Sequence, residues 1–407
     1  MDGQKEKYIK HAAIVPLAGG FSLGASNIIG YPPEIILSYK AFYENDKLYL
    51  RYLKQHNIDV PYFQLDNLSD KINIFNYKID FFHGILPCSA LSQCSQLKAG
   101  TRTTYASVKW MYESADMILR LYKPKIYAFE NAPGLYTGNG KEVRDKLIEI
   151  GKEYGYAITF YKTNTLKHGI PQFRPRTFAL FLKGDKAPIL NYYDKKAPLL
   201  SEYLKQIPKT ASLQDAYMTE EWDITKWEIT KYFKKIYGED WRNTIFNFKT
   251  HTTSYDYLKR KSLLEDFLEF QKSLPDASDI VRKNTEHVIK KRDMNKNFRL
   301  AYRVLGLDRD YVYAVIGEMM HRTVHPDENR LINIREYMTL MNLPFDYELE
   351  NPKEYAKITQ NVPCVTCQDI TTEIIEIIKG NRTLSKNLVL MQDNTKENEK
   401  IKTKLLF

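Results

Sequence analysis

A chain of 407 residues with 43% hydrophobic residues can bury a substantial core and is too apolar for a disordered protein. No apolar run is long enough to cross a bilayer, and the first ten residues, MDGQKEKYIK, lack the apolar core of a signal peptide, so we expect a soluble intracellular protein. The formal net charge of +10 suits a phosphate backbone as a partner, although basic proteins that never touch nucleic acid are common.

Short apolar runs alternate with longer amphipathic runs from residue 11 to about residue 185. The segments that we predict as strands are HAAIVPL (11–17), EIILSYKAFYE (34–44), IDFFHGIL (79–86), KIYAFENAP (125–133), AITFYKT (157–163) and RTFALFLKG (176–184). The predicted helices are GGFSLGASNII (19–29, entered through a tight turn), DKLYLRYLKQHN (46–57), ASVKWMYESADMILRLYKP (106–124) and KEVRDKLIEIGKEYGY (141–156). This alternation predicts an α/β fold with a doubly wound, Rossmann-like, mostly parallel sheet.

The pattern changes near residue 186. Residues 186–320 are charged, aromatic and irregular, which indicates a separate inserted module. After residue 320 the sequence again has the pattern of a compact domain. We therefore predict one domain from residues 1–185 and 321–385, a smaller inserted domain over 186–320, and a frayed polar C-terminal tail over 386–407. Basic residues interleaved with aromatic ones cluster in the insert at 231–242, 257–261 and 281–299; solvated helix faces would explain most of these lysines equally well.

The residues that follow the predicted strands are the candidates for a functional site, because ligands of such sheets bind at the carboxyl ends of the strands. In chain order these segments are LAGGFSLG (17–24), YENDK (43–47), QLDN (64–67), LPCSALS (86–92), FENAPGL (129–135) and GIPQFRPR (169–176). Taken singly, Pro-Cys after a strand is a turn, Glu-Asn is a helix cap, and Arg-x-Arg on a strand edge is a solvated pair.

The four cysteines Cys88, Cys94, Cys364 and Cys367 do not form a secreted disulfide framework in a chain of this length. A zinc site built from the two pairs is disfavoured, because neither pair has finger-like surroundings or a nearby histidine. We expect no metal, and reduced thiols near a core.

In their order and spacing, several of these motifs resemble those of the DNA cytosine-5 methyltransferases, over nearly the whole chain. The matching motifs are Pro87-Cys88, Glu130-Asn131, Gln172-Phe-Arg174-Pro-Arg176, NRLINIREYMTLMNLPFDY (329–347) and QNVP (360–363). The resemblance implies the class I S-adenosylmethionine-dependent methyltransferase fold with an inserted target-recognition domain at 186–320. It also implies an enzyme that works as a monomer on double-stranded DNA, in the cytoplasm of a bacterial, phage or archaeal host cell or otherwise inside a cell with access to DNA.

The chemistry of methylating cytosine C5 explains why these residue types occur together. C5 is a poor nucleophile until a thiolate adds at C6, and Cys88 would supply that thiolate to a base flipped out of the duplex. Glu130 would donate a hydrogen bond or proton to N3, and Arg174 and Arg176 would hold the O2 edge of the base and the nearby backbone.

The resemblance assigns the cofactor S-adenosylmethionine to a second group of residues. The expected contacts are Gly19, Gly20, Phe21, Glu44, Asp66, Pro87, Gln360 and Asn361. Glu44 matches the acid that binds the ribose hydroxyls, and Asp66 the acid near the adenine amino group. The first glycine motif, Phe-x-Gly-x-Gly-Gly, appears as Val15-Pro-Leu-Ala-Gly-Gly20, so the aromatic residue and the first glycine are replaced and Leu17 stands where a bare backbone is expected; Phe21 or Tyr43 would compensate.

The DNA contacts that we predict from the resemblance are Ser89, Gln172 and Arg330. Ser89 replaces the family's usual Gln after Pro-Cys and reaches less far. The recognised site, and a role in restriction-modification, phage defence or regulation, are not readable from the sequence.

Two alternatives stay open. They are an RNA (transfer RNA) cytosine-5 methyltransferase of the same fold and a catalytically weak DNA-binding homologue. A thiol hydrolase in which His83 or His168 serves as the base for Cys88 is disfavoured, because it would leave the order of the motifs unexplained.

Overall fold

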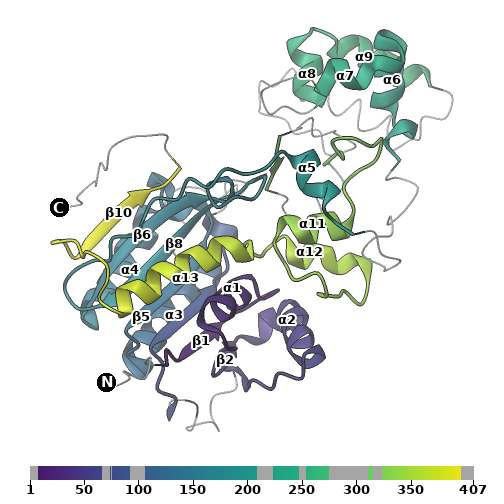
Figure 1. Cartoon of the computed structure of the whole chain (residues 1–407). Coiled ribbons are helices and arrows are strands. Elements are labelled where there is room, and N and C mark those ends of the chain that lie inside the picture. Colours follow the sequence, from purple (N-terminus) through teal and green to yellow (C-terminus); the bar gives the residue numbers. More distant parts are fainter. Residues whose placement is uncertain are drawn as a thin grey trace, which may run out of the picture. The chain divides into compact units, whose positions relative to one another are not determined.

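The computed structural model of the chain describes residues 8–66, 74, 76–91, 106–208, 223–246, 254–274, 310–314 and 323–395. The chain folds into two compact units, which are shown as ribbons in Figure 1. The first unit comprises Met1–Ala197, Thr339–Glu348 and Lys357–Phe407, and the second comprises Pro198–Met338 and Leu349–Ala356. None of the helices in these described ranges is long and apolar enough to span a membrane.

The first unit is built on an eight-stranded sheet with the strand order β10-β6-β8-β5-β4-β1-β2-β3. Its strands are β1 (His11–Ile14), β2 (Ile36–Ser38), β3 (Tyr62–Gln64), β4 (Phe81–Ile85), β5 (Ile126–Asn131), β6 (Tyr156–Asn164), β8 (Pro175–Lys183) and β10 (Val389–Asp393). Every neighbouring pair is parallel except those of β8, which runs antiparallel to both β5 and β6. This confirms the predicted mostly parallel, doubly wound sheet. A two-residue strand, β7 (Gln172–Phe173), precedes β8.

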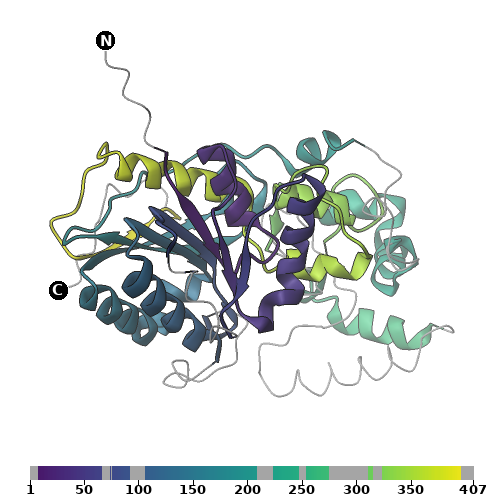
Figure 2. The same ribbon diagram turned by 90° about the horizontal axis from the view of Figure 1, so that it is seen from below.

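Helices cover both faces of this sheet (Figure 2). On one face lie α1 (Gly20–Ile29) and α13 (Cys364–Ile378); on the other lie α3 (Ala106–Met117), which continues into a π-helical turn (Ile118–Tyr122), and α4 (Lys141–Glu153). The helix α2 (Tyr43–Gln55) follows β2. The helices α1 and α13 pack closely, since a Cβ on Gly24 would lie 2.7 Å from the carbonyl oxygen of Cys364.

Two sequence predictions on the first unit need correction. The strand predicted over 34–44 is only β2, and Tyr43 already begins α2, so Glu44 lies on a helix. The frayed tail predicted from residue 386 is wrong for Val389–Asp393, which pair in parallel with Ile158–Lys162 of β6. Burial of Leu390 and Met391 explains this last strand, and its short apolar stretch is hard to recognise in a polar context.

The domain boundaries also differ from the predicted ones. Residues 186–197 belong to the first unit because they form hydrogen bonds with the edge strand β10. For example, Leu190 N donates to the Gln392 side chain at 3.0 Å. Residues 321–338 join the second unit instead, because Arg242 donates to the Glu328 carbonyl at 2.9 Å.

The second unit is helical over most of its described length. It contains α5 (Leu200–Lys205), α6 (Glu228–Tyr237), α7 (Trp241–Phe246), α8 (Ser254–Arg260) and α9 (Leu264–Ser273), with a two-residue strand, β9 (Val312–Tyr313). The short helices α11 (Ile334–Leu340) and α12 (Tyr355–Ile358) cross the boundaries between the units.

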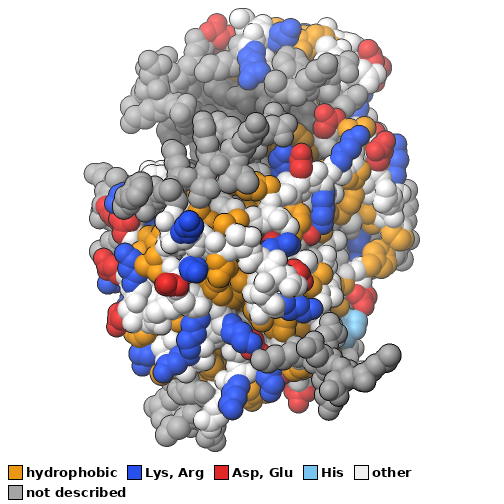
Figure 3. Space-filling model, turned by 60° about the vertical axis from the view of Figure 1, so that its left-hand side comes forward, with side chains coloured by type: hydrophobic (Ala, Val, Ile, Leu, Met, Phe, Trp, Pro, Cys, Tyr) orange, Lys and Arg blue, Asp and Glu red, His pale blue; other side chains and the backbone are white. Residues whose placement is uncertain are grey.

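The aromatic side chains of its basic clusters pack against one another. Phe233 contacts Trp241 and Tyr257 with ring centroids 6.3 and 5.7 Å apart, and all three are buried. These three aromatic residues of the clusters at 231–242 and 257–261 therefore form core. The cluster at 281–299 lies outside the described residues. On the face shown in Figure 3, basic side chains lie among hydrophobic and acidic ones.

Candidate active site

Cys88 and Glu130 follow from neighbouring parallel strands. Ile85, the last residue of β4, is in register with Glu130 in β5, and Cys88 lies three residues beyond Ile85. Because the carboxyl ends of parallel strands meet at one edge of the sheet, the thiol and the carboxyl group come together there. Pro87 and Cys88 are partly exposed, and Ser89, which begins a short 3₁₀ turn (Ser89–Leu91), is exposed.

Two contacts hold the segment that carries Cys88 in place: one comes from β5, and the other comes from the turn that follows β5. The Asn131 side chain donates to the carbonyl oxygens of Leu86 and Pro87 at 3.2 and 3.4 Å. The 3₁₀ turn Pro133–Leu135 lies directly against the Ser89–Leu91 turn, since a Cβ on Gly134 would lie 2.0 Å from the Leu91 carbonyl oxygen. The motifs PC and ENAPG therefore form one packed structure.

Three charged side chains surround the Cys88 thiol: Glu130 and Arg174 are buried, and Arg176 is partly exposed. Arg176 Nε and Glu130 Oε1 form an ion pair at 2.5 Å, and the Glu130 side chain is 2% exposed. Burial raises the pKa of Glu130, although the guanidinium groups of Arg176 and Arg174 act to lower it. Burial also raises the pKa of the Cys88 thiol; the Glu130 carboxylate adds to this rise and the two arginines oppose it. Burial thus favours the neutral form of both groups, whereas the two arginines favour their charged forms.

Arg174 does not point where we predicted. Its side chain is fully buried, and its Nη2 donates to the carbonyl oxygens of Thr359 and Asn361 at 2.5 and 2.6 Å. We expected both arginines to hold the base. This is wrong for Arg174, whose guanidinium group binds the backbone of residues 359–361 instead. Gln172 is also fully buried, with Nε2 3.8 Å from Met341 Sδ, which contradicts the predicted contact with DNA.

A second constellation lies at the end of β1, where the chain turns into α1. Gly20 N donates to Asn361 Oδ1 at 2.9 Å, which joins residues 341 positions apart. A Cβ on Gly20 would lie 2.1 Å from the Val362 carbonyl oxygen, and a Cβ on Gly19 would lie 2.4 Å from the Tyr49 ring. Both positions are therefore closed to larger side chains, as the resemblance to the glycine motif implies. Gly19, with φ at 85°, precedes α1, which has no side-chain cap.

The predicted acids near this loop lie on the surface. Glu44 is exposed and pairs with Lys47 at 2.6 Å, and the exposed Asp66 accepts from the backbone N–H of Lys40 at 2.5 Å. Gln360 is exposed as well and accepts from the Asn45 side chain at 2.8 Å. For these residues, as for Pro87 and Ser89, contact with cofactor or DNA stays a prediction.

The predicted contact between Phe21 and the cofactor is wrong. Its ring is 1% exposed and packs against Phe81, His83 and Phe178, with centroids 6.2, 5.2 and 5.7 Å away. The side chain belongs to the core between α1 and the sheet, so it offers no face to an adenine ring.

Sequence reasoning missed Asp46, which is fully buried and accepts from the backbone N–H of Leu17 at 2.9 Å. A signal was available, because Asp46, Tyr49 and Leu53 follow helical spacing and share the buried face of α2. An acidic residue such as Asp46 on the buried face of a helix needs a hydrogen-bond partner inside the protein.

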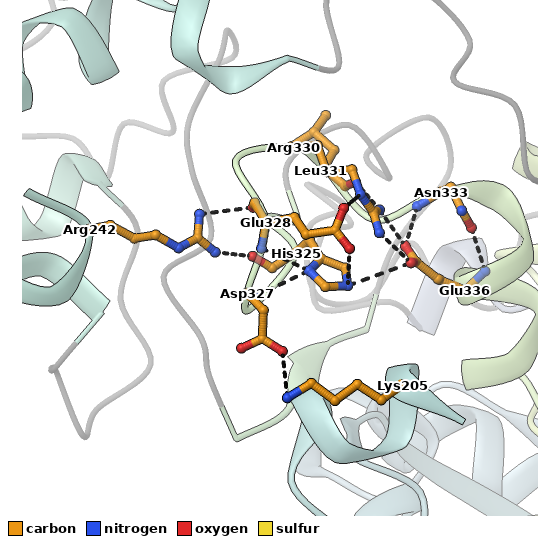
Figure 4. A network of polar contacts seen from close by, with 9 residues as sticks. All are labelled: Lys205, Arg242, His325, Asp327, Glu328, Arg330, Leu331, Asn333 and Glu336. Carbon is orange, nitrogen blue, oxygen red and sulfur yellow. Dashed lines mark hydrogen bonds and ion pairs between the residues drawn. The ribbon is translucent and has the colours of Figure 1, made fainter. Parts of the chain in front are cut away.

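Arg330 lies in the network drawn in Figure 4, within the second unit. Its guanidinium donates to both carboxylate oxygens of Glu336 at 2.8 and 2.7 Å and to Glu328 at 2.6 Å. Glu336 and Asn333 also bond each other's backbone N–H at 2.7 Å, a reciprocal cap at the start of α11. Arg330 thus organises its own segment, and the geometry gives no support to a contact with DNA.

The histidines required by the hydrolase hypothesis are engaged elsewhere. His83 is buried, with Nε2 3.0 Å from Nδ1 of His11. His168 is buried between Thr163 and Asp369, at 2.7 and 2.8 Å. Among the described residues, no group of three or more His, Cys, Asp or Glu side chains could hold a metal ion; Cys94 lies outside those residues.

The fold and this edge of the sheet define a class I methyltransferase. The solved structure of the Entamoeba histolytica methyltransferase EhMeth superimposes with a TM-score of 0.55 at 14% sequence identity, covering 92% of this chain and 99% of that one. The family model of the C-5 cytosine-specific DNA methylase matches residues 15–378, and the chain belongs to this family.

Curated relatives agree with this membership. The Type II methyltransferase M1.HphI of Haemophilus parahaemolyticus is 22% identical over 372 residues, which span 88% of this chain and 85% of the relative. The Type II methyltransferase M.Bpa9945I of Bacillus paralicheniformis is 22% identical over 338 residues, or 74% of this chain and 72% of the relative. The protein is therefore an enzyme of the DNA cytosine-5 methyltransferase type.

Proposed function

We propose that the enzyme methylates C5 of a cytosine flipped out of double-stranded DNA, with Cys88 as the covalent nucleophile and S-adenosylmethionine as the methyl donor. The observation that carries this proposal is the convergence of Cys88, Glu130 and Arg176 at the ends of β4, β5 and β8. A role in restriction-modification fits the curated relatives, which are Type II methyltransferases, whereas the monomeric state rests on the resemblance alone.

The residues at the end of β1 fit the cofactor. The glycine pair Gly19-Gly20 brings the backbone close to its neighbours, and α1 begins without a side-chain cap, which suits the carboxylate of a methionine tail. Glu44 and Gln360 present polar groups at the surface near this loop. When bound, the cofactor supplies an electrophilic methyl group on a sulfonium.

The chain's own residues then account for activation of the base. The Cys88 thiol gives its proton to water, and the thiolate adds to C6 of cytosine. The electron pair displaced from the C5–C6 double bond makes C5 nucleophilic. Burial raises the pKa of Glu130, which favours its role as the donor of a proton toward N3 of the ring. Arg176 stabilises the carboxylate that remains. After C5 gains the methyl group, a base takes the C5 proton and the Cys88 thiolate leaves C6. N3 returns its proton to the Glu130 carboxylate, and the aromatic ring is restored.

The raised pKa of Cys88 has a consequence for timing. The thiol is mostly neutral in the free protein, so the thiolate forms when the base and cofactor are present, and the free protein should react slowly with alkylating reagents. Arg174 and Arg176 then supply the positive field that stabilises the anion.

Covalent trapping tests the proposal. Duplex DNA of mixed sequence with 5-fluorocytosine in place of cytosine cannot lose its C5 substituent, so with S-adenosylmethionine it should become bonded to the wild-type protein. Cys88→Ala should give no adduct, whereas Cys364→Ala, a buried cysteine of α13 outside the site, should trap as the wild type does. An adduct that survives Cys88→Ala would refute the role of that thiol. Methyl transfer to total transfer RNA rather than to duplex DNA would establish the RNA alternative, and calorimetry without a signal for the cofactor would favour the binding-only homologue.

A further inference from the structure

The loop between β1 and α1 contains a leucine in a conformation that suits glycine. Leu17 has φ at 52°, in the left-handed region, and Val15 before it has φ at 48°. Side chains with a Cβ rarely adopt this region, and bulky or β-branched ones do so at a cost in conformational energy. The Leu17 side chain is 5% exposed, so it packs in the core while its backbone keeps the turn. Within the loop, Gly19 N donates to the Pro16 carbonyl oxygen at 2.8 Å and closes the turn around Leu17, so a contact from outside the loop would add to this bond.

Asp46 is positioned to do so. One carboxylate oxygen, Oδ1, accepts from Leu17 N at 2.9 Å, and the other, Oδ2, accepts from the Tyr62 hydroxyl at 3.0 Å. Asp46 comes from α2 and Tyr62 from β3, so two separate elements fix the carboxyl group. Both oxygens of the carboxyl group are therefore engaged as acceptors.

The burial of Asp46 argues for a specific purpose. The side chain is 0% exposed, and burying a carboxyl group costs free energy unless hydrogen bonds compensate it. Burial raises its pKa to about 7, which shows how unfavourable the site is for the charge. The same face of α2 brings Tyr49 against Gly19, so this helix contacts the loop at two points.

We propose that Asp46 is a positioning residue for the cofactor loop, residues 15–20: its carboxyl group holds Leu17 in the left-handed conformation and so replaces the conformational freedom of a glycine. The loop, shaped in this way, follows β1 at the ligand-binding edge of the sheet. This inference rests on the proposed function, because the ligand that the loop receives is S-adenosylmethionine.

A double-mutant cycle tests the proposal, with S-adenosylhomocysteine binding measured by calorimetry on full-length protein. Asp46→Ala should weaken binding at least tenfold, because Leu17 loses its acceptor. In a Leu17→Gly background, Asp46→Ala should weaken binding less than threefold, because glycine adopts the conformation unaided. Asp46→Asn keeps an acceptor and should cost two- to fivefold. Asp145→Ala, an exposed acid paired with Lys141 on α4, is the matched control and should bind as the wild type does.

Amide hydrogen exchange of residues 15–20 in the free protein gives a second readout that needs no ligand. Exchange at Leu17 should speed up at least tenfold in Asp46→Ala and stay unchanged in Asp145→Ala. Equal losses of affinity in the wild-type and Leu17→Gly backgrounds, or unchanged exchange, would overturn the inference. Should Asp46→Ala fail to fold, Asp46→Asn carries the cycle, and its loss must again be recovered by Leu17→Gly.

The two proposals fail differently. A wild-type protein that binds no S-adenosylhomocysteine contradicts the proposed cofactor, while the exchange measurement still decides whether Asp46 holds Leu17. A wild-type protein that binds, with an Asp46→Ala variant of equal affinity, contradicts only the positioning role.

Discussion

Replacing Gly134 by alanine should impair catalysis without removing any group that reacts. The added Cβ would lie 2.0 Å from the Leu91 carbonyl oxygen and 2.9 Å from its carbonyl carbon. A carbon and an oxygen in contact need about 3.3 Å, so the two turns must separate by roughly 1.3 Å. Leu91 N bonds the Cys88 carbonyl at 2.9 Å, so a shift of this turn is passed directly to the nucleophile.

The size of the effect follows from this displacement. Overpacking of a well-packed site costs about 1–3 kcal/mol of folding free energy. A misplacement of about 1 Å costs roughly a hundredfold in rate, or about 2.7 kcal/mol of transition-state stabilisation. We therefore expect methyl transfer to fall by about two orders of magnitude, and the free energy of unfolding to fall by about 1–3 kcal/mol.

Urea unfolding and a methyl-transfer assay on duplex DNA would measure both quantities. Gly138→Ala is the matched control, because Gly138 lies in the next 3₁₀ turn and a Cβ there meets nothing within 4 Å. It should leave activity unchanged and alter stability by less than about 1 kcal/mol. If Gly134→Ala transferred methyl groups as fast as Gly138→Ala, the close contact between the two turns would not control the position of Cys88.

Three further predictions concern stability. Asn361→Ala leaves the Gly20 N–H without its acceptor and should lower the free energy of unfolding by about 1–3 kcal/mol, measured in urea. Burial lowers the pKa of His11 to about 4, so the unfolded chain binds more protons than the native one below its ordinary pKa of 6.5. Stability should therefore fall by about 3 kcal/mol as the pH drops from 6.5 to 4, and acid titration of His11→Gln should lack this loss. Glu336→Gln breaks a nearly buried pair with Arg330 and should destabilise the second unit by about 3 kcal/mol, seen as faster exchange in α11; unchanged exchange would contradict this account.

Much of the architecture followed from local patterns. Alternating strand and helix periods predicted the parallel sheet, and the rule that ligands bind at the carboxyl ends of strands directed attention to Cys88 and Glu130. The pairing of Ile85 with Glu130 agrees with that reasoning. These inferences succeed because each depends on residues close in sequence and on a general rule of chain connection.

The sequence predicted the orientation of individual side chains less well. Phe21 and Gln172 were predicted to contact ligands and are buried, and the Arg174 guanidinium reaches carbonyl oxygens of a distant segment. A motif fixes which residue is present, whereas the direction of its side chain depends on which helix packs over that face of the sheet.

By itself the sequence determined the alternation of elements, the strand ends and therefore the chemistry that gathers there. Only the tertiary structure decided that Asn361 caps Gly20, that β10 closes the sheet beside β6, and that Asp46 holds Leu17. The physical reason is that these contacts join segments brought together by packing of whole helices and strands, and no local period or spacing encodes which distant partner a buried polar group will find.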